Sequence, residues 1–84
     1  MSTANAGNVA TLNTGLPGVR WIQKAIRDQL NVDVEISSQE VLRGKIRWQD
    51  PECLCLIDNE GKEWIIWRQA LVYIRAQGQG EILP

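Results

Sequence analysis

The sequence contains no histidine and no phenylalanine, and only two of its 84 residues are cysteines. Without histidine, metal sites of the Cys/His type and acid–base catalysis by imidazole are excluded. The other residues supply no nucleophile–base spacing, no glycine-rich phosphate loop and no paired carboxylates in an apolar setting. We therefore expect a protein that is not an enzyme and that has no catalytic residue, no metal and no cofactor.

A long apolar run and an excess of one charge are missing too. No stretch of about 18 apolar residues could span a membrane, and the N-terminus lacks the basic and apolar segments of a signal peptide. Nine Lys+Arg residues against ten Asp+Glu residues give a net charge of −1. A polybasic arm that holds RNA or anionic lipid by bulk attraction is thereby excluded. We expect a cytoplasmic protein without a membrane partner.

The two cysteines, Cys53 and Cys55, are two residues apart in a predicted strand. Both side chains then point to one face, with Cα atoms about 6.6 Å apart. This geometry disfavours a disulfide between them. We expect them to act as small apolar residues in a reduced cytosolic protein.

The chain contains one folding unit between two tails. Residues 1–15 carry no charged or aromatic side chain, so we predict a disordered N-terminal tail, and residues 76–84 are predicted to form a flexible C-terminal tail. The unit from 16 to 75 is too short to be very stable alone. Because it has neither a disulfide framework nor a metal, we expect it to oligomerise.

Hydrophobic periodicity changes once along this unit. Apolar residues recur at spacings of three and four from 19 to 30, which predicts a helix over 17–29. Alternation with period two follows and predicts five short strands. The predicted strands cover 32–37, 42–49, 53–57, 63–67 and 71–75. This order predicts an α+β, mostly β fold, with a helix followed by a strongly bent antiparallel sheet, or small open barrel.

The fourth strand is apolar on both faces, with the sequence WIIW at 64–67. Such a strand is a poor free edge. Pairing with the last strand of a neighbouring copy would cover it, and a head-to-tail pairing can close into a ring. We expect Trp64, Ile66 and Tyr73 at this subunit interface.

The second strand has two different faces. Leu42, Gly44, Ile46 and Trp48 are predicted to share the apolar face, and the glycine indicates a sharp bend or a close backbone approach. The other face carries three cations, Arg43, Lys45 and Arg47.

The three cations have two interpretations. They could form a phosphate-binding stripe, or a solvated, salt-paired face. Apolar residues of the first hairpin must share a face, and this predicts Glu35 opposite Arg43 and Asp33 opposite Lys45. Opposite charges across strands are mildly stabilising. Only Arg47 then lacks an acid opposite it.

Three segments resemble Hfq, the bacterial Sm-like RNA chaperone family, in its divergent cyanobacterial branch. They are residues 16–20 (LPGVR), 44–50 (GKIRWQD) and 66–74 (IWRQALVYI). The resemblance covers 16–75 and implies an Sm-like fold. It also implies a homohexameric ring in which strand four pairs with strand five of the next copy. The implied function is RNA binding in post-transcriptional riboregulation.

The resemblance implies a pore-face site for single-stranded, U-rich RNA. The implied RNA contacts are Arg68, Gln69, Gln49, Asp50 and Trp67. Three positions depart from the usual pattern: Gly18 replaces a glutamine, Glu52 or Pro51 replaces an aromatic, and Arg68-Gln69 replaces Lys-His. Since stacking on an aromatic ring contributes about 1–3 kcal/mol per base, we expect weak RNA binding unless Trp48 or Trp67 supplies the ring.

Other surfaces and a second function stay open. Family members bind A-rich RNA on the opposite face, where Glu35 and Gln39 stand here. Lys24 and Arg27 on the helix are candidate rim contacts, and Arg43, Lys45 and Arg47 are candidate sheet-face contacts. The alternative function is a protein-docking ring with little RNA binding, which the resemblance links to pilus or motility machinery.

Overall fold

The computed structural model describes residues 12–77. Of the predicted tails, 1–15 and 76–84, residues 1–11 and 78–84 lie outside the described residues. Ala76, predicted to belong to the C-terminal tail, is instead the last residue of the final strand. Residues 13–16 form a turn closed by a hydrogen bond from the Leu16 N–H to the Asn13 carbonyl at 3.2 Å. No helix in the described part of the chain is long and apolar enough to cross a membrane.

Helix α2 spans Pro17–Asp28 and begins with proline, whose missing N–H needs no partner there. It ends one residue before the predicted end, because Gln29 adopts a left-handed conformation with φ 54°. The Leu30 N–H then donates to the Ala25 carbonyl at 3.0 Å, which closes the helix end. The chain turns directly into the first strand.

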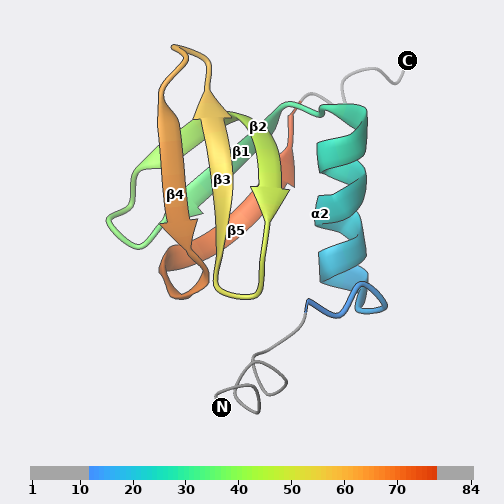
Figure 1. Ribbon diagram of the computed structural model, residues 1–84. Helices are drawn as coiled ribbons and strands as arrows, with labels where there is room; N and C mark the ends of the chain where they lie inside the picture. Colours follow the sequence, from blue (N-terminus) through green and yellow to red (C-terminus); the bar gives the residue numbers. More distant parts are fainter. Residues whose placement is uncertain (1–11, 78–84) are drawn as a thin grey trace, which may run out of the picture.

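Five antiparallel strands follow the helix (Figure 1). They are β1 Val32–Ile36, β2 Val41–Gln49, β3 Cys53–Asp58, β4 Glu63–Trp67 and β5 Leu71–Ala76, with a 3-10 turn, η1 Arg68–Ala70, between β4 and β5. The sheet order is β4-β3-β2-β1-β5. The sheet is not closed by hydrogen bonds, so β4 and β5 are its two edges within this chain. The predicted fold is confirmed.

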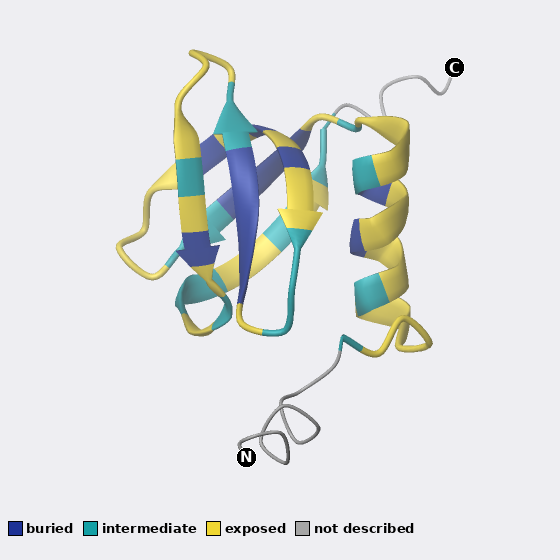
Figure 2. Cartoon of the chain, viewed as in Figure 1, coloured by how far each residue is buried: buried dark blue, intermediate teal, exposed yellow. Residues whose placement is uncertain are grey.

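The core lies inside the bent sheet and under α2. Figure 2 shows the buried residues along β1 and β3 and on the side of α2 that faces the sheet. The buried apolar cluster comprises Ile22, Val32, Val34, Leu42, Ile46, Leu54, Leu56 and Ile66. Helix α2 packs mainly against β2, which fixes the helix beside the strand that leads to the candidate site.

The predicted register of the first hairpin is wrong by two residues. Arg43 pairs with Asp33, not with Glu35, and Val34 pairs with Leu42. The Ile36 N–H donates to the Glu40 carbonyl at 3.0 Å, so the hairpin loop is Ser37–Gln39. A shift of two residues keeps every side chain on its face. Hydrophobic alternation therefore could not distinguish the two registers.

A β-bulge overturns the prediction for Trp48. The pairing of β2 with β3 shifts between Ile46 and Trp48. Beyond the shift Trp48 pairs with Cys55, whereas before it Lys45 pairs with Ile57. Because Cys55 and Ile57 are two residues apart on one strand, their partners share a face of the sheet. Trp48 thus lies on the cation-bearing face and is 41% exposed.

Gly44 lies where the backbone of β3 comes close to β2. A Cβ at this position would be 2.6 Å from the Asp58 Cα and would also overlap the Ile57 carbonyl. The predicted close approach is confirmed, and only glycine leaves room for it.

Candidate nucleic-acid interface

The candidate site lies at one end of the sheet. Figure 1 shows the N-terminal end of α2, the β2–β3 loop and the β4–β5 connection together at this end. The Arg68 N–H donates to the Glu52 carbonyl at 2.8 Å, which ties the two connections together. Between them is an open hollow of about 580 Å³, lined by Pro51, Glu52, Trp67, Arg68 and Gln69.

The guanidinium of Arg68 is held by two acceptors. Its Nε donates to the Asp50 carbonyl at 3.0 Å, and its Nη2 donates to the Gln49 Oε1 at 2.7 Å. The Gln49 Nε2 in turn donates to the Val19 carbonyl at 3.2 Å and to the Gln23 Oε1 at 2.8 Å. Helix α2 thus orients Gln49, and Gln49 orients Arg68. The other guanidinium N–H groups have no partner among the described residues and are free for an anion or a base.

Asp50 stabilises the β2–β3 loop. Its carboxylate Oδ1 accepts the Glu52 N–H at 2.9 Å and the Cys53 N–H at 2.8 Å. These two backbone hydrogen bonds lower the pKa of Asp50, with a smaller contribution from the charge of Arg68. The Asp50 carboxylate thus accepts hydrogen bonds from the loop backbone, and the Asp50 group that accepts a hydrogen bond from Arg68 is the backbone carbonyl.

Trp67 is the aromatic ring of the hollow, and 53% of it is exposed. Trp48 does not line the hollow, because the bulge turns it to the outer face of the sheet. The hollow contains one cation, Arg68, and one acid, Glu52. It therefore combines a ring, an amide from Gln69 and an oriented cation with little net charge.

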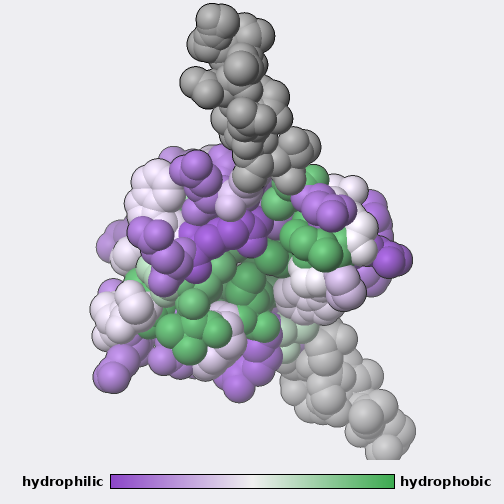
Figure 3. Space-filling view, turned by 90° about the horizontal axis from the view of Figure 1, so that it is seen from below, coloured by the Kyte–Doolittle hydropathy of each residue, from purple (hydrophilic) through white to green (hydrophobic). Residues whose placement is uncertain are grey.

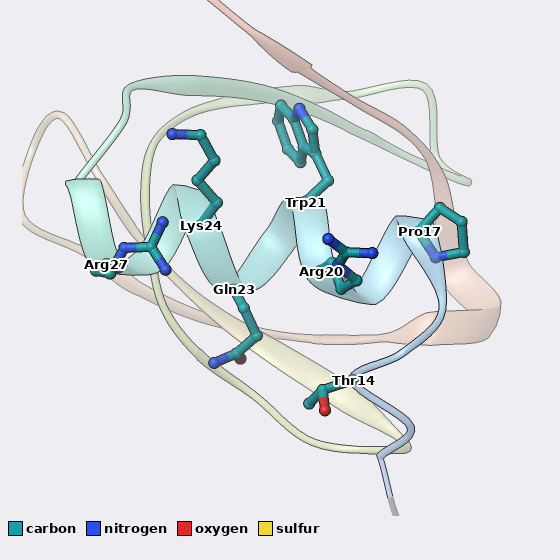
Figure 4. Close-up of a pocket in the computed structure, with 7 residues that line it drawn as sticks. All are labelled: Thr14, Pro17, Arg20, Trp21, Gln23, Lys24 and Arg27. Atoms are coloured by element: carbon teal, nitrogen blue, oxygen red, sulfur yellow. The ribbon is translucent and has the colours of Figure 1, made fainter.

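A second hollow of about 460 Å³ lies on the outer face of α2. It brings the predicted rim residues Lys24 and Arg27 together with Arg20 and Trp21, which sequence reasoning had not selected. Figure 4 shows Trp21 and Lys24 projecting to the same side of the helix. The spacing of the three cations by four and three residues was the available signal. Lys24 and Arg27 contact the carboxylate of Asp28 at 2.9 and 3.4 Å.

The three cations on β2 are in different environments. The Arg43 Nε is 3.3 Å from the Asp33 carboxylate, which also accepts Arg75 at 2.9 Å and Gln77 at 2.7 Å. Asp33 is therefore buried although it is charged. Lys45 and Arg47 are exposed and form no salt bridge within residues 12–77.

A model of the family described as "Hfq related" matches residues 16–76. The chain belongs to the Hfq-related family. This match confirms the resemblance found in the sequence.

Solved structures of Hfq proteins support this assignment. An Hfq protein from Anabaena sp. is 31% identical, with a TM-score of 0.67 over 74% of this chain and 98% of that one. A pleiotropic translational regulator, Hfq, is 19% identical, with a TM-score of 0.64 over 68% of this chain and 93% of that one. At this lower identity it shows the fold alone. No curated protein matches the chain.

YaeO from Vibrio cholerae O395, solved with bound magnesium, has the same fold. It is 23% identical to this chain, with a TM-score of 0.58 over 70% of this chain and 82% of that one. YaeO, which is not named as an Hfq protein, thus shares the fold of this chain. The fold alone therefore does not fix the function, and the features specific to this chain are its side chains.

The predicted interface residues of this Hfq-related chain divide between core and surface. Ile66 is 4% exposed and packs in the core, and Trp64 is half-buried and donates to the Asp58 Oδ2 at 2.9 Å. Tyr73 is 37% exposed on β5. The exposed apolar side chains of the edge strands are Ile65, Trp67, Val72 and Tyr73. In Figure 3, hydrophobic side chains gather across the face seen from below, with hydrophilic ones around them.

Both cysteines are free and buried, as the sequence predicted. The Cys55 Sγ donates to the Glu63 Oε2 at 3.3 Å. Burial, together with this carboxylate, raises the pKa of the Cys55 thiol to about 11. The thiol stays protonated at neutral pH, which fits a packing role.

Proposed function

We propose that this Hfq-related chain assembles into a homohexameric ring that binds single-stranded RNA as a post-transcriptional regulator in the cytoplasm. The observation that carries the proposal is the pair of free edges, β4 and β5, at opposite ends of one sheet. Both edges expose large apolar side chains. Unpaired apolar edges are unfavourable in water, and pairing β4 with β5 of the next copy satisfies both edges at once.

RNA binds at the hollow beside Arg68 under this proposal. Trp67 stacks on a base, Gln69 contacts the edge of the base, and Arg68 holds a phosphate or a base carbonyl. Uridine fits because its carbonyl groups accept hydrogen bonds. Because β4 contributes Trp67 and ends at the hollow, the next copy's β5 would lie beside it and complete the pocket.

Binding should be weaker than in a strongly basic ring. The full chain carries a net charge of −1, and Glu52 lies in the same hollow as Arg68. Neutral subunits gain little from counterion release. Affinity must therefore come from stacking and directed hydrogen bonds.

Two measurements test this proposal. Sedimentation at micromolar concentration should give the mass of a hexamer, and fluorescence anisotropy should show saturable but weak binding of a U-rich oligonucleotide. A monomer would contradict the edge pairing. A ring that binds no RNA even at low salt would contradict the RNA function.

A protein-docking ring is the second candidate function. It is favoured by the hollow on α2, where Trp21 is exposed beside the cations Arg20 and Lys24. Tryptophan and arginine are enriched at protein interfaces. A partner protein with an acidic, apolar docking segment would match this surface. Partners captured from lysate that survive ribonuclease and are lost from the Trp21→Ala ring would favour docking, whereas partners lost with ribonuclease favour the RNA role.

A further inference from the structure

The hollow beside Arg68 contains two opposite charges that do not pair with each other. Arg68 and Glu52 both line it, but the ion pairs found within residues 12–77 do not include one between them. The Arg68 guanidinium donates instead to the Asp50 carbonyl at 3.0 Å and to the Gln49 Oε1 at 2.7 Å. These two bonds fix the cation, so a donor group and an acceptor group stay open to a ligand in one hollow.

Glu52 has a fixed backbone and an open carboxylate. Its N–H donates to the Asp50 Oδ1 at 2.9 Å, and its carbonyl accepts the Arg68 N–H at 2.8 Å. The residue is exposed, and its carboxylate has no hydrogen-bond partner in the described part of the chain. Trp67, which is 53% exposed, lines the same hollow. The hollow therefore combines an anchored carboxylate with an aromatic ring.

A base that fits this hollow must donate to a carboxylate and accept from a guanidinium. The two oxygens of a carboxylate can accept two parallel N–H bonds. Guanine presents two adjacent donors, N1–H and the 2-amino group, beside the acceptor O6. Adenine and cytosine each present one amino group beside an acceptor. Uracil has one N–H between two carbonyl oxygens, which a nearby carboxylate repels.

We propose that Glu52 makes the hollow beside Arg68 select guanine bases in single-stranded RNA. The Glu52 carboxylate accepts the guanine N1–H and 2-amino group, Arg68 donates to O6, and Trp67 stacks on the ring. The inference rests on the proposed RNA-binding function and names the base that the site prefers. It also gives the weak binding of U-rich RNA a local cause, since the same carboxylate opposes the two carbonyl groups of uracil.

The base preference is measured with three oligonucleotides on the unaltered ring. Each is about eight nucleotides long and consists of uridine, with guanosine, inosine or uridine at one central position. Inosine keeps N1–H and O6 but lacks the 2-amino group, so it loses one of the two bonds to Glu52. By fluorescence anisotropy we expect the guanosine oligonucleotide to bind about tenfold more tightly than the all-uridine one. The inosine oligonucleotide should lie between them.

Glu52→Gln tests the carboxylate with little change in shape. An amide has one oxygen in place of two, so the guanosine oligonucleotide should lose most of its advantage. The all-uridine oligonucleotide should bind more tightly, because a negative charge has left the hollow. Glu60→Gln is the matched control, since it removes the same charge from an exposed acid in the β3–β4 turn, 3.7 Å from Lys62. This variant should keep the full preference for guanosine.

The outcomes separate this inference from the proposed function. If the three oligonucleotides bind equally, or if Glu52→Gln keeps the preference, base selection by Glu52 is overturned and the RNA-binding ring stands. If the unaltered ring binds none of them, the proposed function fails and the inference fails with it. Circular dichroism checks that Glu52→Gln keeps the fold, and the comparison on the unaltered ring does not depend on that variant.

A free nucleotide is a second source of guanine. Guanosine 5′-monophosphate at the same concentration should not displace the guanosine oligonucleotide, because it lacks the contacts of the neighbouring nucleotides. Displacement would assign the hollow to a free nucleotide and overturn the RNA contact.

Discussion

The guanidinium of Arg68 donates to the side-chain oxygen of Gln49 at 2.7 Å, although the two residues are 19 positions apart. Gln49 is anchored to α2 through Gln23 at 2.8 Å. The cation of the candidate RNA site is therefore oriented by the helix through one amide. The planar guanidinium group can donate to the Gln49 oxygen and to the Asp50 carbonyl at the same time. A lysine ammonium has no such pair of donors in one plane.

Arg68→Ala should weaken binding of U-rich RNA by roughly one order of magnitude, because it removes a charged hydrogen-bond donor from the hollow. Arg68→Lys should restore only part of the loss, since the fork geometry is gone. Fluorescence anisotropy at about 150 mM salt measures both variants. Tight binding that Arg68→Ala leaves unchanged would refute the pocket assignment.

Blocking one edge strand should break the ring in a defined way. Ile65 on β4 and Val72 on β5 are 46% and 57% exposed. Ile65→Lys and Val72→Lys should each give monomers, because a charge at an apolar edge opposes pairing. An equimolar mixture should form heterodimers only, since each variant keeps one intact edge. Native mass spectrometry measures this, and rings formed by either single variant would contradict the edge pairing.

Gly44→Ala should destabilise the fold by about 1–3 kcal/mol or more, because the added Cβ overlaps the backbone of β3. Gly18→Ala is the matched control: its Cβ would meet nothing within 4 Å. In the first turn of α2 alanine should be neutral or stabilising by up to about 1 kcal/mol. Urea unfolding measures both changes. Equal effects at the two glycines would show that the close approach at Gly44 does not matter.

Asp33 should make stability depend on pH. Hydrogen bonds from Arg75 and Gln77, together with the nearby charge of Arg43, lower the pKa of Asp33. A lowered folded-state pKa stabilises the fold above the unfolded-state value, about 3.9, and this contribution is lost as pH falls through the folded-state value. Asp33→Asn should therefore cost about 1–3 kcal/mol at pH 7. Thermal unfolding from pH 7 to 3 should show the difference from the unaltered chain shrinking below about pH 4. A difference that stays constant across this range would rule out the charge of Asp33 as its cause.

Arg43→Ala should barely alter RNA binding, since the Asp33 carboxylate already holds this guanidinium in an ion pair at 3.3 Å. The sequence led to the same expectation through a different partner, Glu35. Anisotropy of the Arg43→Ala ring at low salt measures it, where any exposed phosphate contact is strongest. A marked loss of affinity would mean that RNA displaces the ion pair.

Much of the fold was determined by the sequence itself. The change of hydrophobic period near residue 30 separates helix from sheet, and the segments shared with Hfq identify the family. Gly44 also indicated its close approach correctly. These features depend on the order of neighbouring residues along the chain, which the sequence gives directly.

Tertiary structure decided the features that depend on which strand residues face each other. The hairpin register differs by two residues from the prediction, and both registers bury the same side chains. The bulge at Arg47 turned Trp48 from the predicted apolar face to the outer one. The hydrogen bond from Arg68 to Gln49 joins the connection between β4 and β5 to the end of β2. The sequence by itself thus determined the elements and the family, while strand pairing decided which cations of β2 form an ion pair among residues 12–77 and which do not.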